Sequence, residues 1–140
     1  EVNPEIKHTI SSINKTWGGD FKIEIISEWK KIIKEKKNAA VKIVHLTMYG
    51  QNINSVETKI RNEDKILIVV GAEKVPREIY ELADYNVAVG NQPHSEISAL
   101  GILLDRIHEG KQFELKFENP ERIIIPQEQG KDVRINKTTD

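Results

Sequence analysis

The hydrophobic residues of this chain recur with two different periods, and the two alternate along the sequence. Near-continuous apolar runs occupy residues 41–46, 66–70 and 85–89, and each is followed by glycine or by a polar loop. Such runs are typical of strands buried on both faces, as in a parallel sheet covered by helices. Between them, residues 27–37, 52–61, 77–83 and 95–108 show helical spacing. The pattern predicts an α/β fold with a mostly parallel sheet flanked by helices.

Both ends of the chain add elements to this core. Asn3, Pro4 and Glu5 are typical of an N-cap, a first helical residue and an acidic first turn, and Gly18 is expected to end that helix. Residues 21–26 alternate as in a short strand, and Ser27 is expected to cap the next helix. Apolar residues alternate with polar ones at 113–117 and 133–135 and form a short run at 123–125, which predicts short C-terminal strands in a hairpin or at a sheet edge.

Composition narrows the class of protein. A length of 140 residues predicts a single domain, 1–140. The absence of cysteine excludes disulfides, and with no signal-peptide pattern it predicts a cytoplasmic protein. The four histidines are scattered, so no metal site is expected, and no apolar run is long enough to span a membrane.

The net charge of −1 leaves room for a local basic patch. The outer face of the helix at 27–37 is such a patch, either a solvated face or an RNA contact, and it carries Lys30, Lys31, Lys34, Lys36 and Lys37.

Three polar loops follow three of the predicted strands, at 46–50, 71–76 and 90–96. Ligands of such sheets bind beyond the carboxyl ends of the strands, so we expect these loops to face one crevice. Gly71 and Gly90 would let a ligand approach the backbone closely. Ordinary turns use the same residue types, and that interpretation stays open. The glycine-rich fingerprints of dinucleotide and P-loop sites are absent from the sequence.

Four polar side chains in these loops have both a functional and a structural interpretation. Lys74 could contact a phosphate or be solvated, and Glu73 could bond a ribose hydroxyl or be a surface charge. His94 could be a titrating group at a helix N-terminus or form a loop hydrogen bond. Ser95 could take part in chemistry or cap the helix that follows it. The residue types alone leave these alternatives open.

Longer motifs at the same loops resemble one family. They are residues 44–50, 70–78 and 82–96, and they are similar to archaeal tRNA (cytidine-56) 2'-O-methyltransferases of the SPOUT superfamily of trefoil-knot methyltransferases. The resemblance implies an enzyme that methylates the ribose of the T-loop cytidine of tRNA. It also implies a homodimer, a deep knot at about 71–108 and a C-terminal strand extension at about 112–136.

The resemblance further implies S-adenosylmethionine as cofactor, held mostly by backbone groups, and tRNA as partner. The ribose 2'-oxygen would displace the sulfonium methyl group. Carried over residue by residue, the implied cofactor contacts are Leu46, Gly71, Ala72, Glu73, Lys74, Val75, Val89, Gly90, Asn91, Gln92, Pro93, His94, Ser95 and Glu96.

One part of the family pattern has no counterpart here. The usual catalytic arginine of the superfamily lies in an N-terminal segment after the first strand. We therefore expect an N-terminal strand–helix unit to be missing, and this chain alone to be truncated and weakly active. Ser95 is then the remaining catalytic candidate. The alternative is a non-catalytic RNA-binding or dimerisation module of the same fold.

Overall fold

The structure is a computed structural model that describes residues 3–71 and 74–136. The chain forms two compact units. The larger comprises Glu28–Glu114, and the smaller joins Glu1–Ser27 to Leu115–Asp140. The prediction of a single domain stays a prediction. Within the described ranges, no helix is both long and apolar enough to cross a membrane.

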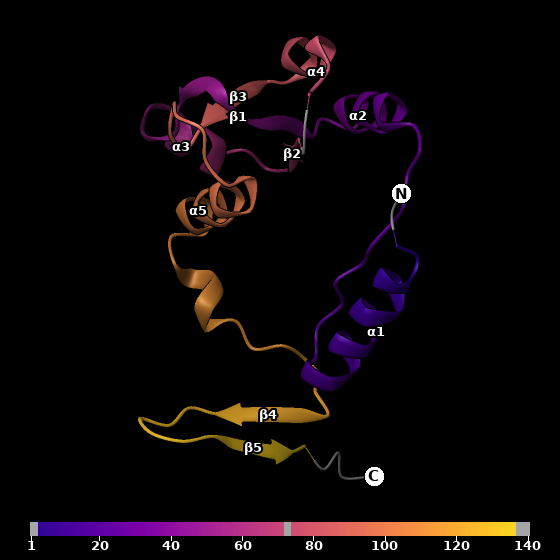
Figure 1. Cartoon of the computed structure of the whole chain (residues 1–140), viewed down its shortest axis with the longest axis vertical. Coiled ribbons are helices and arrows are strands. Elements are labelled where there is room, and N and C mark those ends of the chain that lie inside the picture. The colour runs from indigo at the N-terminus through magenta and orange to yellow at the C-terminus, as the bar shows by residue number, and fades with distance from the viewer. Residues whose placement is uncertain (1–2, 72–73, 137–140) are drawn as a thin grey trace. The chain divides into compact units, whose positions relative to one another are not determined.

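The larger unit is built on a three-stranded parallel sheet (Figure 1). Its strands are β1 (Lys42–Asn52), β2 (Ile66–Val70) and β3 (Tyr85–Ala88), in the order β2-β1-β3. Val44 of β1 lies opposite Ile68 of β2 and Tyr85 of β3. The α/β class with a parallel sheet is therefore confirmed. The knot over 71–108 stays a prediction.

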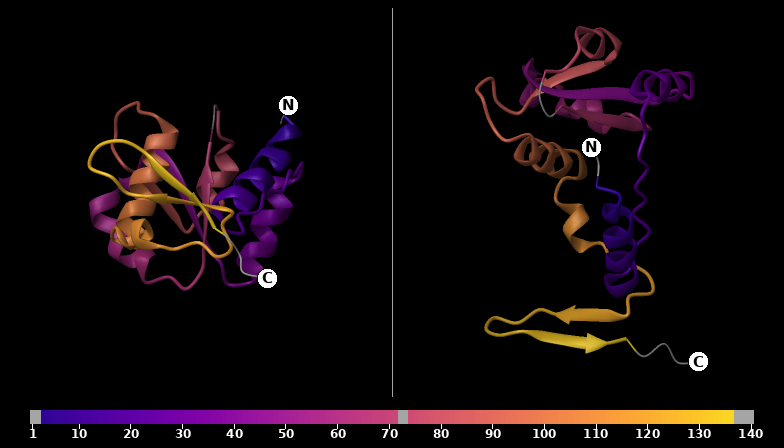
Figure 2. Two further views of the ribbon diagram at one scale, coloured as in Figure 1. Left: turned by 90° about the horizontal axis from the view of Figure 1, so that it is seen from below. Right: turned by 45° about the vertical axis from the view of Figure 1, so that its right-hand side comes forward.

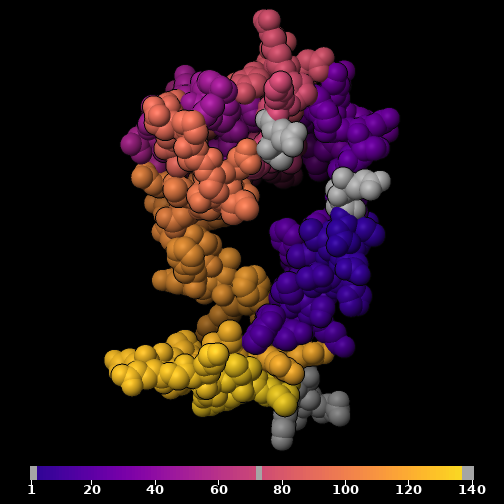
Figure 3. All heavy atoms as spheres, in the orientation of Figure 1, coloured from indigo at the N-terminus to yellow at the C-terminus, as the bar shows by residue number. Residues whose placement is uncertain are grey.

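Helices cover both faces of this sheet. They are α2 (Trp29–Asn38), α3 (Ile53–Arg61), α4 (Arg77–Leu82) and α5 (Glu96–His108), followed by the short 3-10 helix η1 (Lys111–Glu114). Figures 1 and 2 show α4 and α5 on opposite faces. In Figure 3 the orange atoms of α5 lie against the purple atoms of α3. The buried core between α3, α5 and the sheet consists of Val44, Leu46, Ile53, Val56, Ile60, Val87, Ala99 and Leu103.

Two helix starts in the larger unit follow directly from side-chain capping. The side chain of Asn52 accepts a hydrogen bond of 3.0 Å from the backbone N–H of Asn54 and caps α3. Ser95 Oγ accepts one of 3.3 Å from the N–H of Ser98 and caps α5. These side chains satisfy helix N–H groups that have no intrahelical partner. The start at Ser95 was predicted from the sequence and is confirmed, and of Asn52 and Asn54, either of which could start α3 by sequence, the structure selects Asn52.

Other boundaries were wrong. Strand β1 continues through the expected loop at 47–50 to Asn52, because its pairing with β3 resumes at Gln51 after a register shift. Residues 21–26 form no strand, since alternation describes an amphipathic segment but cannot supply a partner strand. Glu28 rather than Ser27 precedes α2, and its side chain makes no cap. The segment 113–117 begins in η1, where a backbone bond from Phe113 to Gly110 closes a tight turn.

The smaller unit combines α1 (Glu5–Trp17) with an antiparallel hairpin of β4 (Arg122–Ile125) and β5 (Asp132–Ile135) (Figure 2). The predicted C-terminal hairpin is thus confirmed for these two strands. Gly18 ends α1 with a φ of 83°, where a Cβ would lie 2.8 Å from the carbonyl oxygen of Glu118. Glycine is required there because both the backbone angle and the space exclude a side chain.

Candidate functional site

A pocket of about 280 Å³ lies at the carboxyl ends of the three strands of the larger unit. Its volume is just below the usual range for small-molecule sites, which begins at about 300 Å³. All three predicted loops contribute to it, together with α4 and the first turns of α5. The lining residues are His45, Leu46, Thr47, Met48, Tyr49, Gly71, Val75, Tyr80, Val87, Pro93, His94, Glu96 and Ala99.

The structure divides the predicted cofactor contacts into three groups. Six of them line the pocket, namely Leu46, Gly71, Val75, Pro93, His94 and Glu96. Ala72 and Glu73 lie outside the described residues. The others do not line it, namely Lys74, Val89, Gly90, Asn91, Gln92 and Ser95.

Among the residues that do not line the pocket, Asn91 holds its wall in place. The side-chain amide of Asn91 donates to the carbonyl oxygens of Met48, at 2.8 Å, and Gly50, at 3.1 Å. These bonds tie the loop after β3 to the end of β1. One side chain, that of Asn91, therefore sets the relative position of two segments that line the pocket, and it does so through hydrogen bonds to backbone carbonyls.

A hydrogen bond within the loop after β3 also fixes the tautomer of His94, which lines the pocket. His94 Nδ1 lies 2.6 Å from the carbonyl oxygen of Gln92. A carbonyl oxygen can only accept, so Nδ1 carries the hydrogen and a neutral His94 presents Nε2 as an acceptor. The loop hydrogen bond that the sequence left as an alternative is thus present in the structure.

The pocket wall includes a buried histidine, His45, whose role the sequence analysis missed. Its side chain is fully buried, and Nδ1 lies 2.9 Å from Oδ1 of Asn86. Asn86 Nδ2 donates to the carbonyl oxygen of Tyr80 at 2.9 Å, which directs Oδ1 toward the imidazole. Nδ1 of His45 must then donate, so Nε2 is left as an acceptor. That buried Nε2 has no partner among the described residues.

Burial controls the protonation of this histidine. Desolvation lowers the pKa of His45 below its ordinary value, and the hydrogen bond to Asn86 opposes this shift only in part. The ring of Tyr80 packs edge-on at 4.7 Å between centroids. The imidazole is therefore a neutral, oriented group near pH 7. Tyr80 in turn joins its hydroxyl to Thr47 Oγ1 at 3.3 Å, so these residues form one polar cluster behind the pocket.

Two glycines show where the backbone has to come close. A Cβ at Gly50 would lie 2.5 Å from backbone atoms of Asn86 and Val87, so β1 and β3 can meet there only through glycine. A Cβ at Gly71 would overlap the side chain of Val75. Gly71 lines the pocket and Gly50 directly follows the lining residue Tyr49, so both glycines allow close backbone approach beside the pocket.

The residues that sequence reasoning missed are His45, Tyr80, Val87 and Ala99. One signal was present for His45, because a polar residue inside a run buried on both faces needs a polar partner. Nothing in the sequence pattern pairs His45 with Asn86, since that contact depends on the register between β1 and β3.

Comparisons with known proteins agree with the motifs. The family model described as "tRNA ribose 2'-O-methyltransferase, aTrm56" matches residues 17–134. The tRNA (cytidine(56)-2'-O)-methyltransferase of Nitrosopumilus maritimus is 63% identical over 140 residues, which is 100% of this chain and 79% of that protein. Proteins of the same name from Cenarchaeum symbiosum and Thermococcus kodakarensis are each 50% identical over 95% of this chain, and the matches cover 75% and 76% of those proteins.

One solved structure with a similar arrangement is Archaeoglobus fulgidus Nep1 bound to S-adenosylhomocysteine. It aligns with 74% of this chain and 48% of that chain, at 7% identity and a TM-score of 0.46. The family model and the sequence relatives are much more specific than this likeness. The chain belongs to the aTrm56 family of tRNA ribose 2'-O-methyltransferases.

Proposed function

We propose that this chain transfers a methyl group from S-adenosylmethionine to the ribose 2'-oxygen of cytidine 56 in the T-loop of tRNA. We further propose that the pocket at the carboxyl ends of β1, β2 and β3 holds the cofactor. One observation supports this proposal above the others. Three segments that are far apart in the sequence line one pocket, in a chain that belongs to a tRNA methyltransferase family. The relatives are named for the same reaction.

The donor set of the pocket fits S-adenosylmethionine. Leu46, Val75 and Ala99 supply apolar surface for an adenine ring. The Glu96 carboxylate lies in the first turn of α5 and would face a ligand that carries sulfonium and ammonium charges. Nε2 of His45 is a buried acceptor without a partner in the described residues, and a hydroxyl or amino group of the ligand could donate to it.

S-adenosylmethionine would supply an electrophilic methyl group: as the C–O bond forms and the C–S bond breaks, S-adenosylhomocysteine would leave and the proton of the ribose hydroxyl would pass to solvent water. The work of the chain is to align the ribose oxygen with that carbon. Asn91 and Gly50 hold the two pocket walls at a fixed separation. We propose that the hydroxyl of Ser95, beside Glu96, orients the ribose hydroxyl for loss of its proton.

We also propose that α5 forms a homodimer contact. Ile97, Ile102 and Leu104 of α5 are 84%, 44% and 36% exposed. Apolar residues gathered on one helix at this exposure are typical of a protein interface. Sedimentation equilibrium of the native chain and of Ile97→Lys tests this directly, because a charged residue at the contact would shift the population to monomer.

Calorimetric titration tests the cofactor site. S-adenosylmethionine is titrated into the native chain, into Val75→Phe, which fills the pocket, and into Val133→Phe as the matched control. Val133 lies on β5 and is 50% exposed, outside the pocket. We expect binding by the native chain and the control, and at least tenfold weaker binding by Val75→Phe. No heat and no thermal shift at millimolar cofactor, or equal affinities in all three proteins, would contradict the proposal.

A further inference from the structure

Helix α2 gathers positive charge in a chain whose formal net charge is −1. Residues 28–38 contain five lysines and two glutamates, a local charge of +3, so the rest of the chain carries −4. A concentration of one sign on a single helix creates a local field even where the whole protein is near neutral. Neither the pocket nor the proposed methyl transfer accounts for this helix.

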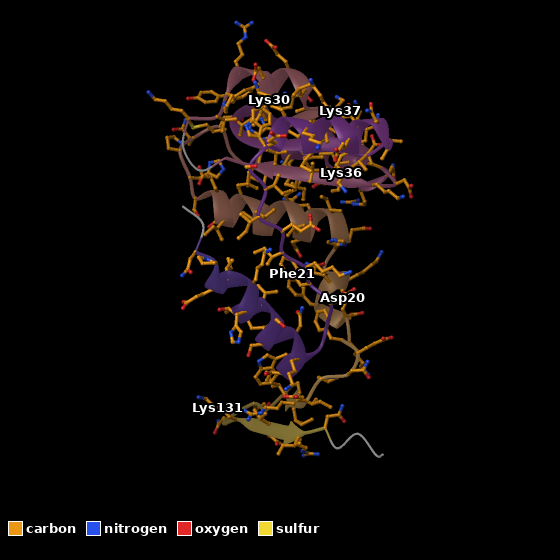
Figure 4. All side chains as sticks on the ribbon, turned by 90° about the vertical axis from the view of Figure 1, so that its right-hand side faces the viewer. Asp20, Phe21, Lys30, Lys36, Lys37 and Lys131 are labelled. Atoms are coloured by element: carbon orange, nitrogen blue, oxygen red, sulfur yellow. The ribbon has the colours of Figure 1, made fainter. Side chains whose placement is uncertain are left out.

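Four of the five lysines of α2 gather on one side of the helix, and Lys36 lies on another side. Lys30, Lys34 and Lys37 follow one another at spacings of four and three residues, and Lys31 lies beside Lys34 by the same rule. Figure 4 shows Lys30 and Lys37 along α2. Ile33, two residues after Lys31 and so on the side of the helix opposite to it, is 3% exposed and anchors α2 to the larger unit. We call Lys30, Lys34 and Lys37, with Lys31 beside them, the lysine row. At 1.5 Å per residue, the row from Lys30 to Lys37 is about 10 Å long.

The two ends of the row are tied to acidic groups, and its middle is not. Lys30 Nζ lies 2.5 Å from Glu78 of α4. Lys37 Nζ lies 3.5 Å from Asp84 and 2.6 Å from the carbonyl oxygen of Leu82. The exposed residues between them, Lys31 and Lys34, make no ion pair in the part of the chain that the structure describes.

Such a row costs stability without a counterion. Like charges three or four residues apart on a helix destabilise it by about 0.2–0.5 kcal/mol per pair. A phosphate backbone would relieve this repulsion along its length. The row is also linked to the pocket through α4, since Lys30 pairs with Glu78 of this helix and Tyr80 of the same helix lines the pocket.

We infer that the outer face of α2, with Lys31 and Lys34 as its free cations, binds the phosphate backbone of the tRNA substrate beside the methyl-transfer pocket. The inference rests on the proposed function, because it takes tRNA as the substrate. Contacts of this kind position a nucleic acid without reading its sequence. They would anchor the tRNA body while one ribose enters the pocket.

The test compares two double variants of the native chain. Lys31→Gln/Lys34→Gln removes the two cations of this face that make no ion pair among the described residues. Lys59→Gln/Lys65→Gln removes two other exposed lysines of the larger unit, on α3 and just before β2, that also make no ion pair within the described ranges. Binding of an unmodified tRNA transcript is measured by filter retention from 50 to 300 mM KCl. S-adenosylmethionine affinity is measured in parallel as a control on the pocket.

For the α2 double variant we expect a dissociation constant about tenfold higher near 0.15 M salt. The slope of log affinity against log salt should become shallower by about 1.5. The α3/β2 control should keep the native slope, and both variants should keep the native cofactor affinity.

Native tRNA affinity and slope in the α2 variant would overturn the inference while leaving the proposed function intact. Loss of binding to polyglutamate with unchanged tRNA binding would assign the face to an acidic protein and also overturn it. Failure of the native chain itself to bind tRNA would instead count against the proposed function.

Discussion

The buried His45 predicts that the chain loses stability as the pH falls below about 6.5. Burial lowers the pKa of its imidazole in the folded state, and the hydrogen bond from Nδ1 to Asn86 only partly offsets this. In the unfolded chain the imidazole titrates near 6.5. Below that pH the unfolded state binds a proton that the folded state resists, so acid favours unfolding. The stability that the neutral His45 imidazole contributes is therefore fully present well above pH 6.5 and is lost as the pH falls below it.

The magnitude follows from proton linkage. Between pH 7.5 and pH 5.5 the unfolded imidazole takes up most of one proton. If the folded state, in which His45 is fully buried, stays neutral over this range, the free energy of unfolding falls by at most about 1.4 kcal/mol. This is a large part of the margin of an ordinary domain.

Urea unfolding at pH 7.5, 6.5 and 5.5 measures the effect in the native chain and in His45→Gln, which keeps an amide donor for Asn86 but has no proton to gain. We expect the native chain to lose up to about 1.4 kcal/mol more than the variant over this interval. Parallel pH profiles for the two proteins, with unchanged urea slopes, would refute the reasoning. They would mean that His45 is either accessible to water or already protonated in the folded state.

Three further predictions concern local structure. Gly50→Ala should destabilise the chain by about 3 kcal/mol in thermal or urea unfolding, because its Cβ would meet backbone atoms of Asn86, whereas Gly101→Ala, exposed within α5, should stabilise it by up to about 1 kcal/mol. Leu103→Ala should cost about 2–5 kcal/mol in the same assay, since Leu103 is fully buried, and a cost under 1 kcal/mol would show that this core was misassigned. Ser95→Ala should lose about 1 kcal/mol of helix capping, whereas Ser95→Asn should keep the cap; unchanged methyl transfer in Ser95→Asn would exclude a catalytic hydroxyl.

Those features that depend on local chemistry could be predicted from the sequence. Ser95 is a short polar residue before helical periodicity and caps the helix expected of it, and Asn52 is one of the two asparagines, with Asn54, that the sequence offers as the start of α3. The parallel sheet follows from runs such as 66–70, which are too apolar for a strand with a solvated face. The hairpin of β4 and β5 likewise follows from the isoleucine run at 123–125 and the alternation at 132–135, which lie on either side of Gly130.

Features that depend on pairing between distant segments could not be predicted. The end of β1 was expected to be a loop because Thr47 and Gly50 are polar and turn-forming, yet the register with β3 extends the strand past them. Residues 21–26 have the alternation of a strand without a strand beside them. The contact of His45 with Asn86 also depends on that register, which is why the polar cluster behind the pocket was missed.

The central claim is methyl transfer to one ribose oxygen. It is tested most directly by incubating the native chain with methyl-tritiated S-adenosylmethionine and two tRNA transcripts that differ only at cytidine 56, which carries a 2'-hydroxyl in one and a 2'-deoxyribose in the other. We predict that label enters the tRNA with the 2'-hydroxyl and that the phosphodiester bond after nucleotide 56 becomes resistant to alkaline hydrolysis. The tRNA with the 2'-deoxyribose should take up no label. Equal labelling of the two transcripts, or no labelling of either, would contradict the account.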